Sequence, residues 1–281
     1  NKVKSLDFPV MSHIKKIVWG SDCIVEDLGP PGFFSYYNLT QILIPKLVKI
    51  IPPKLFDHCQ YLSYVGFEKD SLLEEIGDSS FAHTRISEVV LPKSVLRIGK
   101  SAFADNENLK KVVFDGQVID DEAFSNTGIT SFKLSNNATM IGSGAFQHCH
   151  SLKTFDVDIE NSNLSKIGSF AFYESSITSI KIPSKVEIIK KFTFNGCKYL
   201  KEVIFSNNSQ LHSIKDNSFS GDLSLEKINL PKTIKKLSHM AFINTPSLES
   251  ILNESNQYFN VLEDKTVYEN DCSLVFVPRT I

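Results

Sequence analysis

Residues 91–103 read LPKSVLRIGKSAF and residues 141–152 read IGSGAFQHCHSL. Both stretches contain an Ile–Gly step, and a Phe stands five residues after each of these Ile residues. This Phe returns along the chain at steps of 21 to 26 residues, at Phe56, Phe81, Phe103, Phe124, Phe146, Phe172, Phe194, Phe219 and Phe242. Self-similarity at such a step predicts a repeat architecture, in which each unit is one coil of a solenoid.

Two further apolar columns keep the register of the Phe. An Ile, or a Leu in the last unit, stands five residues before each Phe: Ile51, Ile76, Ile98, Ile119, Ile141, Ile167, Ile189, Ile214 and Leu237. A third column follows the Phe, as a Leu six residues on or an Ile five residues on: Leu62, Leu109, Leu152, Leu200, Leu225 and Leu248, with Ile86, Ile129 and Ile177. One unit cannot bury such columns alone, whereas stacked units bury them in a continuous core.

A short alternating run follows the third column, as in Ile180–Lys181–Ile182. Alternation of this kind predicts a strand with one face in the core. Several runs end in Pro, and apolar residues then follow at steps of three, which predicts a tight arc rather than an α-helix. The sequence therefore predicts a leucine-rich-repeat solenoid. We expect a curved stack of units of about 23 residues, with a parallel sheet on one face and short turns or 3-10 segments on the other.

The two ends of the chain differ from the middle. Residues 1–55 hold a divergent form of the repeat, in which Ile17 and Trp19 fit a strand and Phe34 fits a further unit. Residues 56–252 are predicted to be the regular repeats. Residues 253–281 lack the landmarks, and their apolar pattern predicts a β-hairpin turning around residues 269–271. We expect more chain to follow residue 281 in the full-length protein.

Composition and charge narrow the classes of function. The 281 residues include 30 Lys and Arg and 32 Asp and Glu, for a net charge of −2. This balance gives no support to a nucleic-acid partner. No uninterrupted apolar stretch approaches the length of a membrane-spanning helix, so we expect no membrane insertion within this segment. Five cysteines are too few for a disulfide-stapled scaffold.

Cysteine and histidine recur at fixed places after the landmark Phe. Cys59, Cys149 and Cys197 stand three residues after it. The closest two lie two units apart, about 10 Å on the spacing of strands, which is too far for a disulfide. We predict buried thiols that fill a turn. Cys23 and Cys272 lie in the terminal regions, where they could be free or paired.

The column two residues after the Phe contains His58, His83 and His148. His58 and His83 fall in neighbouring units and could stack. Together with residues 148–150 (His–Cys–His) they suggest a metal site, but neither a C-x-x-C pair nor an H-E-x-x-H motif is present, so exposed turn histidines are favoured. Residues 142–144 (Gly–Ser–Gly) are similar to a phosphate loop, yet they lack the Lys of a P-loop and lie inside the repeat register. We therefore predict no catalytic residues, no metal site and no cofactor.

In each strand, the residues two and four after the third column are predicted to face solvent. Val90 and Val113 are neighbours there and form a small apolar stripe with Leu43 and Gly66, in a column that ends at Leu252. The side chains on this face are not needed for the core, so their identity is free to vary with the binding partner. The alternative is that the valines reflect ordinary β-propensity. The predicted protein-binding residues on this concave face are Tyr64, Glu88, Val90, Lys111, Val113, Lys133, Thr154, Asp156, Lys181 and Glu202.

The units resemble the BspA-type leucine-rich repeat, whose pattern is Leu-Pro-x-x-Val-x-x-Ile-Gly-x-x-Ala-Phe-x-x-Cys-x-x-Leu. Residues 91–103 and 141–152 match this pattern closely, and the resemblance covers roughly residues 39–252. The terminal hairpin is similar to a segment found between arrays in that family. Proteins of the family are typically surface-exposed or secreted molecules of host-associated bacteria and parasitic protists, implicated in adhesion and in aggregation with other cells.

The resemblance implies a non-enzymatic, adhesin-like module on the cell surface or secreted, which binds a host extracellular-matrix or cell-surface protein through its concave sheet. Fold alone does not establish such a function. The alternative is an intracellular scaffold that uses the same surface for protein–protein interaction. A third possibility, an enzyme accessory or a hydrolase, lacks a catalytic constellation in the sequence. The sequence does not predict the oligomeric state.

Overall fold

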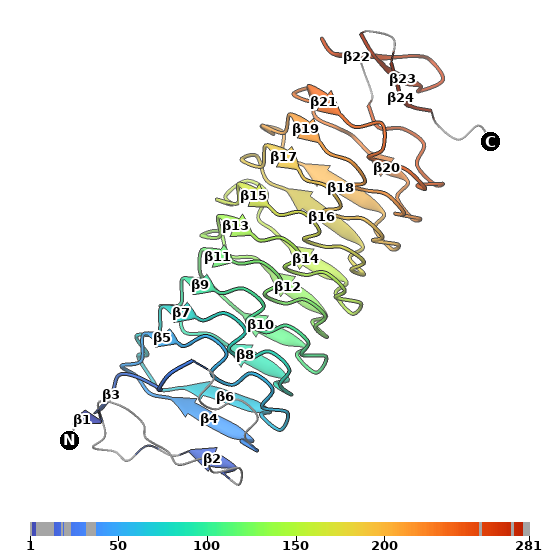
Figure 1. Cartoon of the computed structure of the whole chain (residues 1–281). Helices are drawn as coiled ribbons and strands as arrows, with labels where there is room; N and C mark the ends of the chain where they lie inside the picture. Colours follow the sequence, from blue (N-terminus) through green and yellow to red (C-terminus); the bar gives the residue numbers. More distant parts are fainter. Residues whose placement is uncertain are drawn as a thin grey trace.

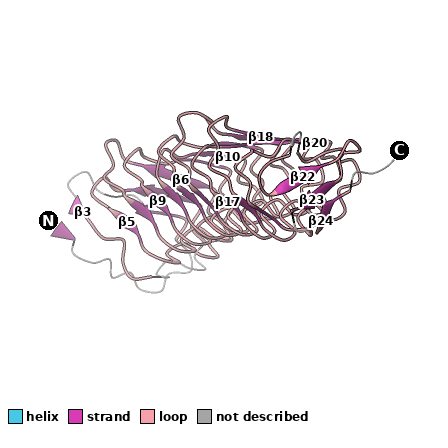
Figure 2. Cartoon of the chain, turned by 90° about the horizontal axis from the view of Figure 1, so that it is seen from above, coloured by secondary structure: helices cyan, strands magenta, loops and turns pink. Residues whose placement is uncertain are grey.

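The structure is a computed structural model that describes residues 2–3, 14–17, 19, 24–31, 38–252, 255–270 and 273–277. The chain forms an elongated stack of coils with its two termini at opposite ends (Figure 1). Strands and turns make up these ranges, and no helix is among them (Figure 2). Accordingly, no described segment is a helix with the length and apolar character that a membrane crossing needs.

One side of the stack is a row of parallel strands, which we call the open sheet. Its strands follow the third apolar column, and buried and exposed residues alternate along them, as in Glu88–Val89–Val90. Within its ladders neighbouring strands pair in parallel, with Glu88 opposite Lys111 and Val90 opposite Val113. The strands are β2 (Lys16–Ile17), β4 (Gln41–Ile44), β6 (Tyr64–Phe67), β8 (Glu88–Val90), β10 (Lys111–Val113), β12 (Ser131–Lys133), β14 (Thr154–Asp156), β16 (Ser179–Ile182), β18 (Glu202–Phe205) and β20 (Lys227–Ile228).

A second side is built from two-residue strands, which we call the short sheet. The residue that faces inward in each is the Ile or Leu five residues before the Phe, and all nine are buried. The strands are β5 (Ile50–Ile51), β7 (Glu75–Ile76), β9 (Arg97–Ile98), β11 (Val118–Ile119), β13 (Met140–Ile141), β15 (Lys166–Ile167), β17 (Ile188–Ile189), β19 (Ser213–Ile214) and β21 (Lys236–Leu237). At the N-terminal end, β1 (Lys2–Val3) pairs in parallel with β3 (Ile24–Val25).

The short sheet resolves the predicted arc into two parts. A turn starts at the Pro that ends a long strand, where the Val95 amide donates to the Pro92 carbonyl at 3.0 Å. The two-residue strand then follows. Turns, and no 3-10 helix, occupy the connecting segments within the described residues. The three-residue spacing of the apolar residues after the Pro thus arises from a turn followed by a two-residue strand.

The third side consists of the Phe-bearing turns, which are bonded from coil to coil. The Phe81 amide donates to the Ala102 carbonyl at 2.9 Å, and the His83 amide donates to the Ala104 carbonyl at 3.1 Å. The residue two after each Phe has a positive φ in all nine units, and these residues are His58, His83, Asp105, Asn126, His148, Glu174, Gly196, Gly221 and Asn244. Gly, Asn, Asp and His tolerate this left-handed conformation better than other residues do, which explains why histidines recur there.

The nine landmark Phe side chains form one ladder through the core. Successive rings stack with centroids 5.2 to 5.6 Å apart. Eight of them are fully buried, and Phe242 is partly buried at the end of the ladder. Offset aromatic pairs of this kind add about 0.5–1.5 kcal/mol each beyond their burial. The predicted repeat and the predicted parallel sheet are therefore confirmed.

Units with a Leu six residues after the Phe are one residue longer there than units with an Ile five residues after it, and the difference lies in a single turn. In the longer units the amide of the Leu donates to the carbonyl three residues earlier, as Leu109 does to Asn106 at 3.0 Å. The shorter units have Thr84, Thr127 or Ser175 three residues after the Phe and continue without that turn. The Thr127 hydroxyl lies 3.3 Å from the thiol of Cys149 in the following coil. A short unit thus places a hydroxyl against the polar group of its longer neighbour.

The C-terminal segment forms a three-stranded antiparallel sheet of β22 (Phe259–Val261), β23 (Val267–Glu269) and β24 (Leu274–Phe276). Its Phe276 ring meets Phe242 edge-on at 6.4 Å, so the sheet contacts the end of the Phe ladder. Phe34, Cys23 and Cys272 lie outside the described residues. The division of the chain at residues 55 and 252 stays a prediction.

Candidate functional site

All ten of the predicted binding residues lie exposed on the open sheet, in two columns on its outer face. Val90 and Val113 are 57% and 44% exposed, although both are apolar. The inward residues of the same strands, such as Val89, are buried. Two residues of the predicted outward column are buried rather than exposed: Gly66 within β6 and Leu252, which lies beyond the last long strand. The outer face of the sheet therefore carries side chains that the core does not use.

The exposed apolar residues of the open sheet cluster toward its N-terminal half. In the structure Tyr64 takes the place of Gly66 in the predicted stripe, and we call Leu43, Tyr64, Val90 and Val113 the apolar stripe. Each of these side chains is more than two-fifths exposed. Gly66 has no side chain to continue the column that begins at Leu43. The Tyr64 side chain lies over Gly66 instead, since a Cβ on Gly66 would be 2.8 Å from the Tyr64 hydroxyl oxygen. The stripe is consequently continuous across four strands.

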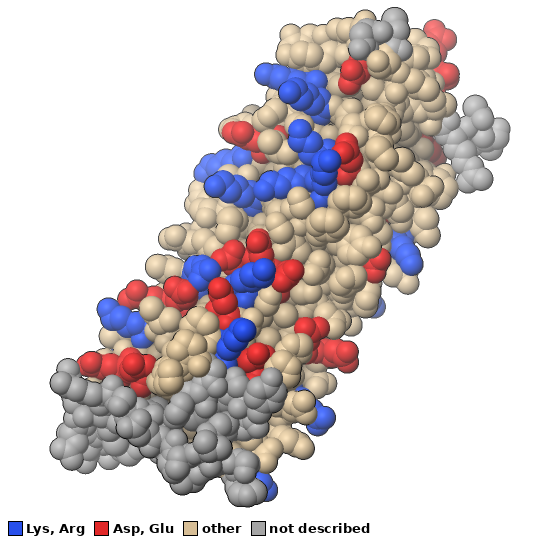
Figure 3. Space-filling model, viewed as in Figure 1, with Lys and Arg blue, Asp and Glu red and all other residues tan. Residues whose placement is uncertain are grey.

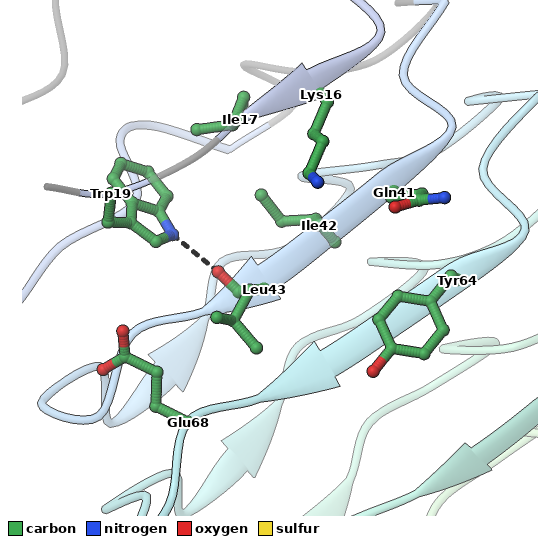
Figure 4. Close-up of a pocket in the computed structure, with 8 residues that line it drawn as sticks. All are labelled: Lys16, Ile17, Trp19, Gln41, Ile42, Leu43, Tyr64 and Glu68. Carbon is green, nitrogen blue, oxygen red and sulfur yellow. Dashed lines mark hydrogen bonds between the residues drawn. The ribbon is translucent and has the colours of Figure 1, made fainter.

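The N-terminal end of the apolar stripe opens into a hollow of about 320 Å³ (Figure 4). The Trp19 indole nitrogen donates to the Leu43 carbonyl oxygen at 2.6 Å, which fixes the indole beside the edge of β4. Lys16, Gln41 and Glu68 bring polar groups to the same hollow. Large aromatic side chains with one polar end are typical of protein-binding surfaces. Trp19 was not among the predicted binding residues, because the irregular N-terminal pattern did not place it on this face.

The C-terminal end of the stripe meets charged residues. Val90, Val113 and Lys133 line a hollow of about 600 Å³ where their strands end. Farther along, the Lys181 ammonium lies 3.9 Å from a carboxylate oxygen of Asp156. Both side chains are about half exposed, so this ion pair contributes little to stability. The open sheet thus passes from apolar to charged along its length.

Charges elsewhere on the surface are unevenly spread. Lys and Arg gather on the visible face around β15 to β21, whereas both signs mix around β7 to β11 (Figure 3). On the short sheet the Arg97 guanidinium bonds Glu75 and Asp120 and lies 3.5 Å from Asp78. Burial lowers the pKa of Arg97, but bonding to Asp120 and the neighbouring carboxylates more than offset it, so the net pKa is raised. This network spans three coils and is structural.

The three thiols lie where the spacing predicted them. Cys59, Cys149 and Cys197 are all buried. The Cys149 thiol donates to the Phe124 carbonyl at 3.1 Å, and burial raises the pKa of this thiol to about 11. A thiol is reactive mainly as a thiolate, so these cysteines act as fillers of the turn. The prediction of buried thiols is confirmed.

Residues 142–144 follow the repeat and not a phosphate loop. Gly144 has φ +63° in the column two before the Phe, where several other units also have positive φ. A Cβ on Gly142 would lie 2.4 Å from the backbone of the preceding coil. The Ser143 amide already donates to the Asp121 carboxylate at 2.6 Å. Close packing of coils thus accounts for Gly142, and the positive φ of this column accounts for Gly144.

The histidines of the turn column are brought together in part. The rings of His58 and His83 lie with their centroids 4.1 Å apart and are tilted by 37° to each other. His148 instead lies 3.3 Å from a carboxylate oxygen of Glu174. The Nδ1 atom of His58 also lies 2.8 Å from a carboxylate oxygen of Asp57, a residue outside the histidine column.

The repeat sequence identifies the family. A sequence model described as the BspA type leucine-rich repeat region, with six copies, matches residues 30–153 and 117–249. The chain belongs to this family. Its BspA-type coils have the strand, turn and Phe ladder described above. No curated protein matches the sequence.

Solved structures with similar folds include other leucine-rich repeat proteins. The pneumococcal vaccine antigen PcpA is 24% identical with a TM-score of 0.59, over 87% of this chain and 73% of that one. A leucine-rich repeat protein from Bacteroides ovatus ATCC 8483 is 20% identical with a TM-score of 0.44, over 84% and 86% of the two chains. A leucine-rich cell surface protein from Faecalibacterium prausnitzii A2-165 is 19% identical with a TM-score of 0.39, over 86% of each. The likeness to PcpA supports the fold.

Proposed function

We propose that this BspA-type chain is a non-enzymatic protein-binding module of the cell surface or of a secreted protein, and that the open sheet binds its ligand. Exposure of the apolar stripe carries the proposal, since these side chains contribute nothing to the core and project from one rigid face. Exposed apolar patches with a polar rim mark interaction sites in many proteins. Family membership supports the adhesin-like role and a host extracellular-matrix or cell-surface protein as the ligand.

Binding on this face would be distributed over side chains from several strands. The apolar stripe supplies burial near β4 to β10, and Lys133, Asp156 and Lys181 supply charges that set orientation. The parallel ladder holds these side chains at fixed spacing, so little ordering is required when a ligand binds. The hollow beside Trp19 extends the apolar area at the N-terminal end.

A charge-insertion experiment tests the binding role. The double variant Val90→Asp and Val113→Asp places two carboxylates in the stripe, at exposed positions that do not affect the core. The matched control is Ile50→Asp and Leu96→Asp, on or beside the short sheet, where the side chains are 52% and 47% exposed. Capture of proteins from an extracellular-matrix extract should fall at least about tenfold for the first variant and remain for the control. Equal capture by both variants would exclude the stripe.

The cellular location needs a separate test. Protease treatment of intact cells that express the full-length protein should remove the repeat region if it lies outside the cell. Protection of the repeats until the cells are lysed would favour the intracellular scaffold, which uses the same sheet. This outcome would leave the binding role of the open sheet in place.

A further inference from the structure

A histidine pair and a carboxylate meet on the turn side of the stack, at the level of β6. The ligand atoms of Asp57, His58 and His83 all lie within 4.8 Å of one another. Their side chains are 17%, 34% and 42% exposed, so an ion from solution can reach them. Within the described part of the chain, this is the one group of three that qualifies as a potential metal site.

The three groups are held by backbone that the repeat makes rigid. His58 and His83 have φ values of +59° and +55° at equivalent places in successive coils. The His58 amide donates to the Ala82 carbonyl at 3.1 Å, directly before His83. The coil-to-coil bond therefore fixes the spacing of the two imidazoles, and Asp57 is fixed by being next in sequence to His58.

The Nδ1 atom of His58 lies 2.8 Å from a carboxylate oxygen of Asp57, so these two donor atoms are already close enough to share one ion. A carboxylate outside the group of three flanks the second imidazole, because the Nδ1 atom of His83 lies 3.7 Å from a carboxylate oxygen of Asp105. A carboxylate beside one ring nitrogen orients the imidazole and increases its basicity as a ligand. Asp105 thus positions His83 from the next coil, without being one of the three ligands.

We propose that Asp57, His58 and His83 bind one divalent transition-metal ion of the zinc class, which links two successive coils. Two imidazoles and a carboxylate are a donor set that zinc accepts, with water in the remaining position. Tetrahedral ligand atoms about 2.0–2.1 Å from zinc lie roughly 3.3 Å apart, so side-chain rotation at this exposed site closes the group around the ion. The sequence pattern favoured exposed turn histidines without a metal, because it did not show that Asp57 lies close to His83.

Conservative variants test this site, because the repeat itself shows which residues fit. Asn occupies the column of His83 at Asn126 and Asn244, and Asn195 occupies the column of Asp57. His83→Asn and Asp57→Asn are therefore expected to fold. His148→Asn is the matched control, since His148 occupies the same column but lies outside the group of three.

The experiment is calorimetric titration of the untagged chain with zinc ion, followed by thermal unfolding with and without the ion. The unaltered chain and His148→Asn should bind one ion per chain with micromolar affinity, whereas His83→Asn and Asp57→Asn should bind at least about tenfold more weakly. Zinc should raise the melting temperature of the first two only. Lack of binding at about 1 mM zinc, or equal loss in His148→Asn, would overturn the proposal. Circular dichroism without metal verifies that each variant is folded.

Discussion

Asp222 is the least expected polar residue in the core, and its replacement by Asn gives a sharp prediction. It stands three residues after Phe219, in the column of Cys149 and Cys197, and is fully buried. Its Oδ1 atom accepts from the Cys197 amide at 2.9 Å, but its Oδ2 atom has no hydrogen-bond partner. Burial raises the pKa of this carboxyl well above its ordinary range.

Asn106 shows what an amide does at the same place in another coil. Its oxygen accepts from the Thr84 amide at 3.1 Å, as Asp222 does from Cys197. Its amide nitrogen donates to the carbonyls of Phe81 and Phe103 at 2.8 and 2.9 Å. An ionised Asp222 cannot donate to the corresponding carbonyls. Asp222→Asn should supply these bonds at every pH and remove a carboxyl whose ionisation at high pH would bury a charge.

The size and pH dependence of the effect follow from this geometry. A buried unsatisfied polar atom costs about 1–3 kcal/mol of stability. For a chain of this size, each kcal/mol changes the melting temperature by roughly 2–4 °C. The folded pKa of Asp222 exceeds the unfolded one, so the native protein loses stability as the pH rises from the ordinary Asp range, near pH 4, to the folded pKa. Asp222→Asn should stabilise most at high pH and least near pH 4.

Thermal unfolding by circular dichroism from about pH 4 to pH 9 measures this difference. Asn106→Asp is the reciprocal control and should destabilise increasingly as the pH rises. A gain in Asp222→Asn that is the same at every pH would mean that ionisation of the carboxyl is not the cause. A loss of stability in this variant would contradict the comparison with Asn106.

Three further predictions concern other parts of the stack. Phe146→Ala should lower the free energy of unfolding by about 3–5 kcal/mol in denaturant titration, and Phe242→Ala by less because its ring is only partly buried; equal losses would argue against the ladder. Cys149, with its raised thiol pKa of about 11, should react with a thiol reagent only after denaturation, and rapid labelling of its peptide in the native protein would refute its burial. Arg97→Ala should cost about 1 kcal/mol or less, with the loss reduced by salt, because the side chain is 36% exposed; a loss insensitive to salt would point to packing instead.

Much of the fold could be predicted because the core columns are periodic. The Phe and the Ile or Leu before it keep their separation of five residues in every unit, and a stack is the arrangement that buries both. The outer face of the open sheet could be inferred from alternation in strands such as β16, where Ile180 and Ile182 are buried and Lys181 is exposed. Periodicity also placed the buried thiols.

The short sheet and several polar contacts could not be predicted, for physical reasons. A two-residue strand such as β9 has no alternation of its own and exists through its bonds to β7 and β11. Asp57 lies outside the histidine column, and its proximity to His83 depends on the stacking of coils. Tyr64 covers Gly66 through its side-chain rotamer, which a sequence pattern does not encode.

Photo-crosslinking from defined positions tests most directly whether the open sheet is the ligand-binding face. A benzophenone amino acid placed at Val90 on the open sheet or at Leu96 beside the short sheet samples two exposed apolar positions, 57% and 47% exposed. With intact protein and the ligand captured from extracellular matrix, we expect the crosslinked product from position 90 and little from position 96. Crosslinking mainly from position 96, or equally from both, would contradict the account.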